Sequence, residues 1–571
     1  MEDIDYQRLE LPYRAHDPDD TRHLPLVVVG AGPVGLSLAL DHAQRGHKVV
    51  VIDDSNRLAT GSRAICFSKR ALDIWDRLGV AERMVRKGVS WHTGKVFFRD
   101  QQVWQFDLLP ETGHRRPAFI NLQQYYCEGY LYEAACAHPN IELRWKHKAI
   151  AVHQNDNSVS VTIETPDGVY TLDCDWLLAC DGARSSVRKM IGQESRGRVF
   201  HDRFLIADVK MDLDYPPERW FWFDPPFHPN QSVLLHSQPD NVWRVDFQLG
   251  WDADPAEEVR HENVIPRIQA LLGKDIDFDI EWISVYTFAC ERMERFRHGR
   301  IIFAGDSAYR VSPFGARGAN SGIEDADNLA WKLDMVMRGQ APDSLIDTYC
   351  EERSVAADEN LMNSSRSTDF ITPKSEISLL FRNTALTLAE HHDFARALVN
   401  SGRLSKPVCY AQSRLNTPEQ DAFNAVAAVG AAATDAPVTV MNQHDDQAGR
   451  LTDDTSHTDW WLSQMKGNFV LAVFCDRQAP SPGLVDTLFR LQSESQVPLD
   501  VKLVLSPALA RHARLPLRTY VDHTNALMWR YDAHGGACYL IRPDQHIAAR
   551  WRDTDPAAIR SALKRATAAP D

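Results

Sequence analysis

The feature that most constrains the fold is the stretch PLVVVGAGPVGLSLALDHAQRGHKVVVIDD at residues 25–54. It begins with an apolar run at Leu26–Val29, which is typical of a buried strand, and passes through a glycine turn into apolar residues at helical spacing. A second apolar run, Lys48–Ile52, follows Gly46, which is placed to end the helix. This order predicts a β-α-β unit that begins a parallel sheet, and therefore an α/β fold.

The turn of this unit carries a G-x-G-x-x-G pattern made by Gly30, Gly32 and Gly35. In such a turn the first glycine permits the bend, the second lets a pyrophosphate approach the backbone, and the third lets the helix pack on the sheet. An acidic residue that binds a ribose is expected at the end of the second strand. Asp53 stands there, with Asp54 as the alternative. The unit therefore predicts a dinucleotide site rather than a purely structural turn.

Length and composition indicate a globular protein of more than one domain. The 571 residues exceed what one compact core holds, and 44% are hydrophobic and 25% charged. The formal net charge of -15 argues against nucleic acid as a partner, because phosphate binding needs a basic surface. The 22 histidines lack the spacing of metal ligands, so no metal is expected.

Targeting features are also lacking in the sequence. The acidic start of the chain has no apolar segment of the secretory type, and the ten cysteines include no CxxC pair. The longest apolar run, Leu24–Leu40, is interrupted by the glycine turn, so no membrane span is expected. These features predict reduced thiols and a cytoplasmic location.

Further along the chain, the pattern changes to short alternating strands. Residues 143–178 contain a Pro-Asp-Gly turn at Pro166–Gly168, which predicts an antiparallel hairpin. Residues 204–285 alternate and are rich in aromatic side chains, which predicts a sheet that walls a cavity. A buried strand at residues 299–306 is followed by helical segments to about Ser401.

The C-terminal region has a pattern of its own. Strand, helix and strand signals followed by a hairpin, after a small-residue region at 421–441, predict a thioredoxin-like domain. Cys475 and Gln478 stand where a redox member would carry CxxC. Without a second thiol, dithiol exchange is excluded there, and we expect a structural or dimer-forming role.

Two more motifs follow strands. The strand in CDWLLACDGARSSVRKMIG ends at Asp181-Gly182, before a helix that Ser185 or Ser186 can cap. The strand in RIIFAGDSAYRVSPFGARGAN ends at Gly305-Asp306 and leads to glycines at the start of a helix. Bare backbone N–H groups there favour an anionic or electron-rich ligand, and a carboxylate stands near to meet a ribose or ribityl hydroxyl.

The three motifs together, in this order over residues 25–400, resemble the signatures of the single-component FAD-dependent aromatic hydroxylases. This family includes para-hydroxybenzoate hydroxylase, phenol hydroxylase and 3-(3-hydroxyphenyl)propionate hydroxylase, and the C-terminal region is similar to that of phenol hydroxylase. The resemblance implies an α/β fold in which a Rossmann-like FAD-binding domain is interleaved with an antiparallel-sheet substrate domain, plus the thioredoxin-like domain. The expected segments are a polar leader (1–24), a first FAD-binding segment (25–195), the substrate-binding sheet (196–290), a second FAD-binding segment with helices (291–420) and the thioredoxin-like domain (421–571).

The resemblance also implies which residues bind FAD. The ADP half would be bound by Gly30, Gly32, Pro33, Gly35 and Asp53, and the pyrophosphate and ribityl chain would lie near Arg63 and Gln124, with Gln123 as the neighbouring alternative. Asp181 would serve both FAD and the nicotinamide, and Gly305 and Asp306 would bind the ribityl chain. The pyrimidine edge of the flavin would meet Gly318, Ala319 and Asn320. Tyr309 and Arg317 depart from the family, which often has His and Gln there. Arg317 either favours an anionic reduced flavin or points into solvent.

The activity implied by the resemblance is hydroxylation of a phenolic or related aromatic substrate. NADH or NADPH reduces FAD, and molecular oxygen then gives a flavin hydroperoxide that transfers one oxygen atom to the ring. A single dinucleotide fingerprint favours transient nicotinamide binding. A homodimer is expected. The alternatives are a flavin-dependent halogenase, although RWFWFDPPF lacks the Ile-Pro of the WxWxIP stretch, and a non-catalytic flavoprotein binding module.

Candidate catalytic residues follow from the position of the cavity sheet. They are Pro313, which the resemblance puts beside the flavin ring, and the polar residues His236, Arg244 and Tyr286, with Asp246 and Gln248 as further candidates. Three tryptophans, Trp220, Trp222 and Trp243, have rings that can stack on a substrate. The sequence leaves open which of these side chains face the cavity.

Overall fold

The computed structural model describes residues 4–17, 22–59, 61, 64–399, 406–441, 457–510 and 516–570. They divide into two compact units. Unit 1 contains Met1–Pro110, Pro117–Ala326 and Ala356–Lys406, and unit 2 contains Glu111–Arg116, Asp327–Val355 and Pro407–Asp571. The five-segment division expected from the sequence and the thioredoxin-like character of the C-terminal region remain predictions.

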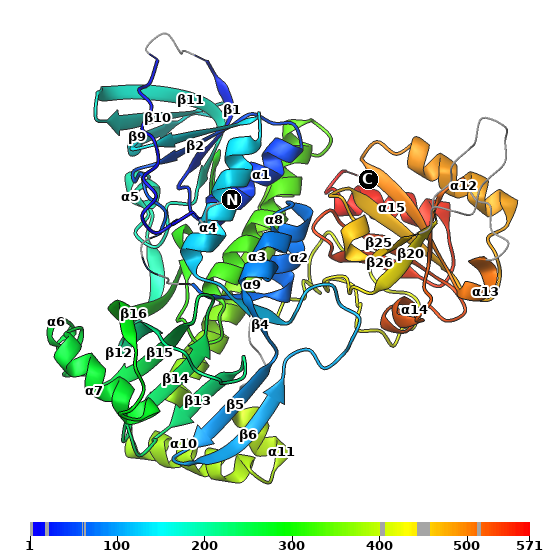
Figure 1. Ribbon diagram of the computed structural model, residues 1–571. Helices are drawn as coiled ribbons and strands as arrows, with labels where there is room; N and C mark the ends of the chain where they lie inside the picture. The colour runs from blue at the N-terminus through cyan, green and yellow to red at the C-terminus, as the bar shows by residue number, and fades with distance from the viewer. Residues whose placement is uncertain are drawn as a thin grey trace. The chain divides into compact units, whose positions relative to one another are not determined.

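The first sheet of unit 1 contains the predicted β-α-β unit, which is dark blue in Figure 1. Its parallel strands lie in the order β18 (Ile301–Phe303), β11 (Gly168–Ala179), β1 (Leu24–Val29), β2 (Val49–Asp53) and β8 (Ile141–Trp145). Helix α1 (Pro33–Gln44) connects β1 to β2, with Pro33 in its first turn, where proline lacks only an N–H that is unused in any case. Both faces of β1 and β2 are buried, which explains their unbroken apolar sequence.

The expectation of antiparallel pairing at residues 143–178 was right only for the middle of that region. Strands β9 (Lys148–Gln154), β10 (Val159–Thr165) and the first half of β11 form the predicted hairpin around Pro166–Gly168. The second half of β11 runs parallel to β1, and β8 runs parallel to β2. Alternation stops where β11 becomes buried on both faces, at Leu177–Ala179. The two-residue strand β17 (Arg297–His298) completes the sheet beside β18.

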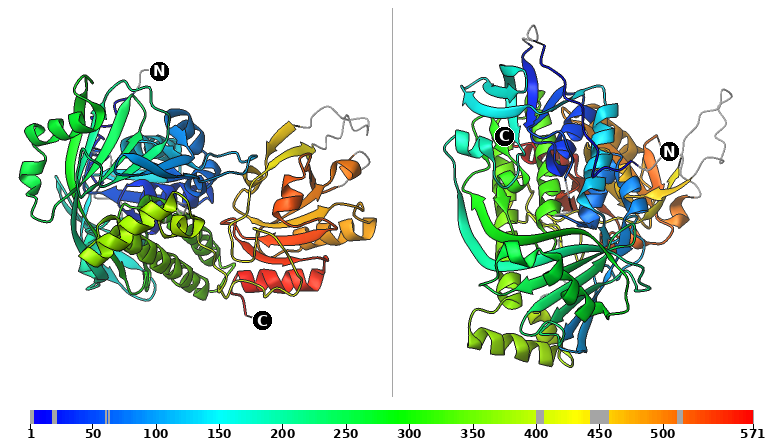
Figure 2. Two further views of the ribbon diagram at one scale, coloured as in Figure 1. Left: turned by 90° about the horizontal axis from the view of Figure 1, so that it is seen from below. Right: turned by 60° about the vertical axis from the view of Figure 1, so that its left-hand side comes forward.

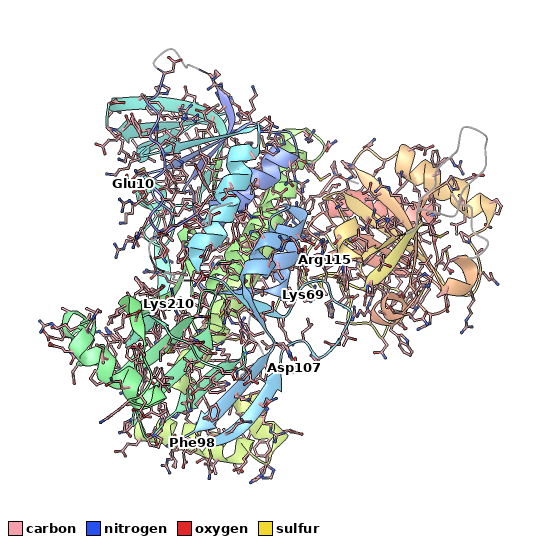
Figure 3. The ribbon with its side chains drawn as sticks, viewed as in Figure 1. Glu10, Lys69, Phe98, Asp107, Arg115 and Lys210 are labelled. Atoms are coloured by element: carbon pink, nitrogen blue, oxygen red, sulfur yellow. The ribbon has the colours of Figure 1, made fainter. Side chains whose placement is uncertain are left out.

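The second sheet of unit 1 is the expected aromatic-rich sheet. Its strands lie in the order β19 (Tyr309–Arg310), β16 (Asp279–Met293), β12 (Ser195–Lys210), β15 (Val242–Leu249), β14 (Ser232–Ser237), β13 (Arg219–Phe223), β5 (Thr93–Phe98) and β6 (Gln101–Asp107). The long strands β12 and β16 are strongly curved (Figure 2). The hairpin β5–β6 was not predicted from the sequence. It joins the edge of the sheet through β13, which runs parallel to β5. Strand β5 ends at Phe98, which is labelled in Figure 3.

Helices cover both faces of this sheet. Apolar side chains of α7 (His261–Leu272), which follows the short α6 (Pro255–Glu258), pack on one face. On the other face, α10 (Glu376–Ala389) and α11 (Asp393–Leu398) contribute to an apolar cluster with Val96, Phe223 and Phe288. The remaining elements of unit 1 are the small sheet β3 (Cys66–Ser68), β7 (Phe119–Asn121) and β4 (Val89–Trp91), and the helices α2 (Lys69–Arg77), α3 (Ala81–Lys87), α4 (Gln124–Ala137) and α5 (Ser186–Met190).

Two long helices contribute residues to both units: α8 (Gly318–Met337) and α9 (Ser344–Ile371). Unit 2 is otherwise built on a sheet with strand order β21 (His457–Trp460), β20 (Pro437–Met441), β24 (Arg518–Val521), β23 (Leu499–Leu505), β22 (Phe469–Cys475), β25 (Ala537–Ile541) and β26 (Ile547–Trp551). Its helices are α12 (Pro482–Ser493), α13 (Pro507–Ala510), α14 (Ala526–Arg530) and α15 (Pro556–Ala566). The predicted strand, helix, strand and hairpin of this region are all present. None of the described helices has the length and apolar character needed to cross a membrane.

Candidate active site

The glycine turn after β1 combines two tightly packed positions with one open position. A Cβ atom at Gly30, whose φ is +104°, would lie 2.4 Å from the carbonyl oxygen of Cys180, and one at Gly35 would lie 1.9 Å from that of Gly30. A Cβ atom at Gly32 would meet no atom within 4 Å. The fold itself therefore requires Gly30 and Gly35, whereas the bare backbone of Gly32 borders open space at a helix start. This fits a phosphate-bearing ligand.

Asp53 is the last residue of β2, where the sequence placed a ribose-binding carboxylate. Its Oδ2 accepts the N–H of Ala31 at 2.8 Å, and its Oδ1 accepts the N–H of Ser55 at 2.8 Å. These two bonds hold the carboxylate beside the glycine turn. Burial raises the pKa of Asp53.

Asp181 and Gly182 follow β11, the neighbour of β1 in the sheet. The Oδ2 of Asp181 accepts the N–H of Val187 at 3.0 Å and the hydroxyl of Ser186 at 3.1 Å, but its Oδ1 is buried without a hydrogen-bond partner among the described residues. A Cβ atom at Gly182 would meet nothing within 4 Å. A buried carboxylate oxygen that lacks a donor, next to open backbone, fits a ligand hydroxyl or amide.

Asp306 is exposed in a turn whose other residues are fixed by buried contacts. The N–H of Gly305 donates to Oδ2 of Asp325 at 2.9 Å, and the hydroxyl of Ser307 donates to the carbonyl of Ala179. Arg188 donates to the carbonyl of Ser307 at 2.7 Å. The strand end is thus rigid, while the Asp306 carboxylate is presented outward, where a ribityl or ribose hydroxyl can reach it.

The loop from Pro313 to Gly318 leads from this turn into α8. Gly315 and Ala316 both have left-handed backbone conformations, with φ of +97° and +52°. At the start of α8, the side chain of Asn320 accepts the N–H of Ser68 at 2.8 Å and donates to the carbonyl of Cys66 at 2.9 Å. The amide of Asn320 therefore holds the start of α8 against β3, which leaves its backbone as the group available to a cofactor.

The structure locates the two departures from the family pattern. Tyr309 is buried, and its hydroxyl donates to Oδ1 of Asp325 at 3.1 Å. Arg317 is also buried and donates to Oδ1 of Asn360 at 2.9 Å. The alternative that Arg317 points into solvent is wrong.

Two further cofactor candidates, Gln123 and Gln124, lie at the start of α4. The Oε1 of Gln124 accepts the N–H of Ala64 at 3.1 Å, and its Nε2 donates to Glu128 at 2.7 Å. Gln123 donates to the carbonyl of Pro239 at 3.1 Å, while its Oε1 is buried without a partner among the described residues. Arg63 lies outside the described residues. The roles assigned to these three residues remain predictions.

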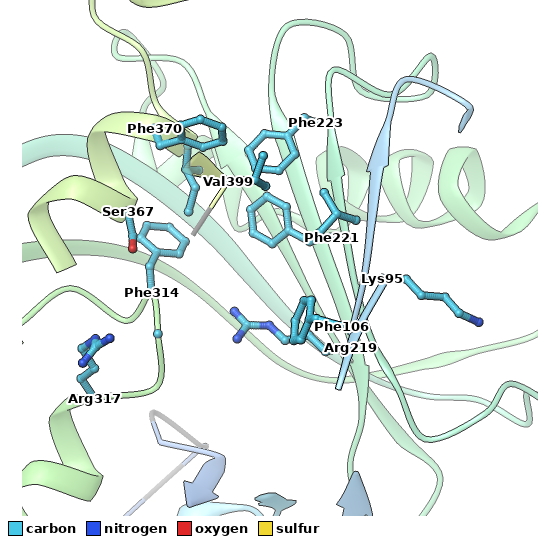
Figure 4. A pocket seen from close by; sticks show the side chains of 13 residues that line it. Lys95, Phe106, Arg219, Phe221, Phe223, Phe314, Arg317, Ser367, Phe370 and Val399 are labelled. Atoms are coloured by element: carbon cyan, nitrogen blue, oxygen red, sulfur yellow. The ribbon is translucent and has the colours of Figure 1, made fainter. Parts of the chain in front are cut away.

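A cavity of about 80 Å³ lies next to the Pro313–Gly318 loop (Figure 4). Its walls are mostly aromatic: Phe106, Phe221, Phe223, Phe314 and Phe370, with Val96, Ile371 and Val399. The polar lining side chains include Arg219, Arg317 and Ser367, whereas Lys95 points away in Figure 4 and pairs with Glu218 at 2.6 Å. An apolar space with aromatic walls suits an aromatic compound.

Strand register shows which candidates share the cavity face of the sheet. Phe221 pairs with Leu234, and His236, two residues on, pairs with Arg244, which pairs in turn with Asp208. Because side chains alternate along a strand, Phe221 and the candidates lie on one face. Those candidates are His236, Arg244, Asp246, Gln248 and Tyr286.

The tryptophans predicted to stack on a substrate lie on the other face, so this prediction was wrong. Trp220, Trp222 and Trp243 have the opposite parity and pack in the apolar cluster with Val264 and Ile268 of α7. Their bulk covers the back of the sheet. The phenylalanines that alternate with them in RWFWF line the cavity instead.

The polar residues of the cavity face differ in how well they are paired. Arg244 donates to Asp208 through Nε at 2.8 Å and through a second nitrogen at 2.7 Å, which forms a buried bidentate ion pair. The Nε2 of His236 and the Oδ1 of Asp246 are buried without hydrogen-bond partners among the described residues. Burial, and then Arg219 and Arg244, hold the pKa of His236 well below its usual value, so its imidazole is neutral. Burial raises the pKa of Asp246 to about 6.

Several cavity residues escaped the sequence reasoning. Arg219 was passed over as a member of an aromatic run, although the alternation in RWFWF already put it on the same face as Phe221 and Phe223. Phe370 and Val399 come from segments after α8 that carry no local signal of a cavity. Only the fold brings them to this sheet.

Comparison with known proteins agrees with this geometry. Residues 23–364 match the family model described as FAD binding domain. The chain belongs to this family. The predictions of FAD as the cofactor and of the α/β fold are confirmed. The chain is similar over 97% of its length to the flavin-dependent monooxygenase PieE, solved with FAD and substrate, with a TM-score of 0.76 and 21% identity. The predicted resemblance to FAD-dependent aromatic hydroxylases is supported by the named relatives.

Two curated relatives are aromatic hydroxylases. The chain is 32% identical over 338 residues to a probable NADH-specific resorcinol 4-hydroxylase of Rhodococcus jostii, which covers 57% of this chain and 62% of that protein. It is 30% identical over 342 residues to the 3-(3-hydroxy-phenyl)propionate/3-hydroxycinnamic acid hydroxylase of Shigella sonnei, which covers 59% of this chain and 60% of that protein. The matched region thus spans about three fifths of the length of these relatives.

Proposed function

We propose that this protein is an NAD(P)H-dependent monooxygenase that hydroxylates a phenolic or related aromatic compound. The observation that carries the proposal is the aromatic cavity bordered by Phe314, Gly315 and Arg317, in the loop that follows the Gly305-Asp306 turn and the short strand β19. In an FAD-binding chain, this puts an aromatic pocket beside residues expected to meet the flavin. The names of the two hydroxylase relatives support the same reaction class.

The residues that would hold FAD are those whose backbone or carboxylate a ligand can reach. These are Gly32 at the helix start, Asp53 at the end of β2, Asp181, whose Oδ1 has no hydrogen-bond partner within the described part of the chain, the exposed Asp306, and the backbone of Gly318, Ala319 and Asn320. FAD bound there supplies hydride acceptance from NADH or NADPH and the activation of molecular oxygen. Pro313 begins the loop that would face the ring system.

The chain's own contribution to the reaction is to exclude water and position the substrate. The phenylalanine walls hold a ring in an apolar space. His236 is neutral, and its Nε2 lies on the cavity face of the sheet without a hydrogen-bond partner among the described residues, so it is suited to accept a hydrogen bond from a phenol hydroxyl, which polarises the O–H bond and makes the ring more electron-rich. Tyr286 remains a candidate for a second hydrogen bond to substrate. Arg244 acts through its ion pair with Asp208, as a positioning residue.

Purified protein tests the proposal directly. We expect a yellow protein with near-equimolar FAD, NADH or NADPH oxidation that a phenol accelerates, and one oxygen atom from labelled O2 in the product. A protein that oxidises reduced nicotinamide at the same rate with and without every phenol tested would contradict it and favour the non-catalytic alternative. A halogenated product in the presence of chloride or bromide would favour a halogenase.

A cytoplasmic homodimer remains our prediction, to be checked by cell fractionation and light scattering.

A further inference from the structure

Arg219, the first residue of β13, is a cavity residue with an unusual environment. Its side chain lies on the same face of the sheet as Phe221 and extends in Figure 4 toward the region of the cavity where Arg317 lies. Among the residues that the structure describes, its guanidinium has no hydrogen bond and no ion pair. Burial lowers the pKa of Arg219, and electrostatic interactions with Cys66 and Asp246 oppose this shift.

Arg244 is a second arginine of the same sheet, and its guanidinium has a carboxylate partner within the protein. It lies two strands away on the same face, and its buried charge is met by both oxygens of Asp208, one of which also accepts a bond from Gln238 at 3.0 Å. Burying a positive charge without a carboxylate partner costs free energy of folding, because the charge loses its hydration. Folded proteins therefore seldom contain such a charge unless a ligand pairs with it. Arg219 reaches the cavity from the same sheet without a carboxylate of this kind.

Asp246 forms no ion pair with Arg219 among the described residues. Its Oδ1 is buried without a hydrogen-bond partner in the described chain. Both residues thus face the same region with unused hydrogen-bonding groups. Together with the phenylalanine walls, this gives a cavity with one long apolar side and one cationic side formed by Arg219 and Arg317.

We propose that Arg219 recognises a carboxylate on the aromatic substrate, so that the substrate class is phenols that carry an acid group. The ring would lie against Phe221, Phe223 and Phe314, and the two oxygens of the carboxylate would accept two parallel N–H bonds from one edge of the guanidinium, a pairing that is stronger and more directional than a neutral hydrogen bond. Arg317 adds positive potential to the same side. This inference rests on the proposed function, because it names the substrate of the same cavity.

The test compares acids with their neutral amides on the full-length, FAD-loaded protein. The probes are 3-(3-hydroxyphenyl)propionate and 3-hydroxybenzoate, each against its primary amide, with affinity measured from the change in flavin absorbance. We expect the wild type to bind at least one acid about tenfold or more tightly than its amide, because desolvated charge-assisted pairs are stronger than neutral ones. The Arg219→Met variant should lose this preference while its affinity for the amides changes less than about threefold. Arg219→Lys should restore part of it.

The control is Arg196→Met, which changes an arginine of β12 whose side chain is 82% exposed. It should leave the acid preference unchanged. Equal binding of acids and amides by the wild type, or an equal loss of both in Arg219→Met with unchanged FAD content and melting temperature, would overturn the inference. In both cases phenol-stimulated oxidation of reduced nicotinamide would leave the proposed function standing. If no acid or neutral phenol binds or stimulates, the proposed function fails and this inference fails with it.

Discussion

The hydroxyl of Tyr309 lies 3.1 Å from Oδ1 of Asp325, and the other oxygen of that carboxylate accepts the N–H of Gly305 at 2.9 Å. Tyr309 therefore supports the turn that presents Asp306. The departure from the family pattern at this position is a structural one, because the tyrosine donates to the same carboxylate that fixes the backbone of the turn.

Tyr309→Phe should lower the stability of the protein and loosen its hold on FAD. A buried hydrogen bond to a charged group contributes about 1.5–3 kcal/mol, so a clear fall in melting temperature is expected. FAD retained after gel filtration should fall in parallel. Tyr215→Phe, in which an exposed tyrosine is changed, is the matched control. An unchanged melting temperature for Tyr309→Phe would show that the bond to Asp325 does not support the turn.

Substitutions in the glycine turn should distinguish a residue needed for FAD binding, Gly32, from one needed for folding, Gly35. Gly32→Ala adds a methyl group into open space, so the apoprotein should melt at the wild-type temperature while FAD binding weakens about tenfold or more. Gly35→Ala puts a methyl group 1.9 Å from a backbone carbonyl, so the apoprotein itself should be destabilised by several kcal/mol. Calorimetry of the two apoproteins and FAD titration distinguish them. If Gly32→Ala binds FAD as tightly as wild type, the pyrophosphate does not lie at this turn.

Asp306→Ala should lose FAD more readily than wild type. The carboxylate is exposed, and the bonds that fix Gly305 and Ser307 go to other residues, so its removal should cost little apoprotein stability. Dialysis followed by flavin absorbance measures the effect. Asp486→Ala, at an exposed position in α12, is the control. Equal FAD retention by wild type and Asp306→Ala would remove this residue from the cofactor site.

Sequence patterns correctly predicted the features that are formed by residues close to one another in the chain. The β-α-β unit, the position of Asp53 at a strand end and the turns at Asp181 and Gly305 all follow from short-range patterns. The hairpin β5–β6 and the cavity residue Phe370 were not predicted, because their places depend on pairing with segments more than a hundred residues away. The sequence also left open which side chains face the cavity, because this depends on the register of the strands. A shift of one residue would have put Trp222 on the cavity face in place of Phe221.

Asp246 should make stability depend on pH. Its folded pKa of about 6 lies above the unfolded value of 3.8, so the protonated form is favoured in the folded state and stability is lost as pH rises through about 6. A pKa difference of this size corresponds to up to about 3 kcal/mol. Asp246→Asn should therefore raise the melting temperature more at about pH 8 than at about pH 4. The exposed Asp252→Asn is the control, and a gain that does not depend on pH would contradict the assignment.

In unit 2, Glu352 is the acceptor of a fully buried charge network. Its Oε1 accepts from Arg542 at 2.6 Å and its Oε2 from Lys332 at 2.7 Å, while Arg542 also pairs with Asp544. Burial alone would raise the pKa of Glu352, but Arg542 and Lys332 hold it well below its usual value. Burial lowers the pKa of Lys332 to about 8.

Glu352→Gln leaves Arg542 and Lys332 with less negative charge in an apolar surrounding. Removing one member of a buried ion network costs about 3–5 kcal/mol, because the remaining charges keep their desolvation penalty. The neighbouring Glu351 pairs with Arg414 at the surface, where such a pair contributes about 0–1 kcal/mol, so Glu351→Gln is the control one residue away. Urea unfolding of both variants measures the difference. Similar midpoints for the two variants would show that the network is replaceable and does not stabilise unit 2.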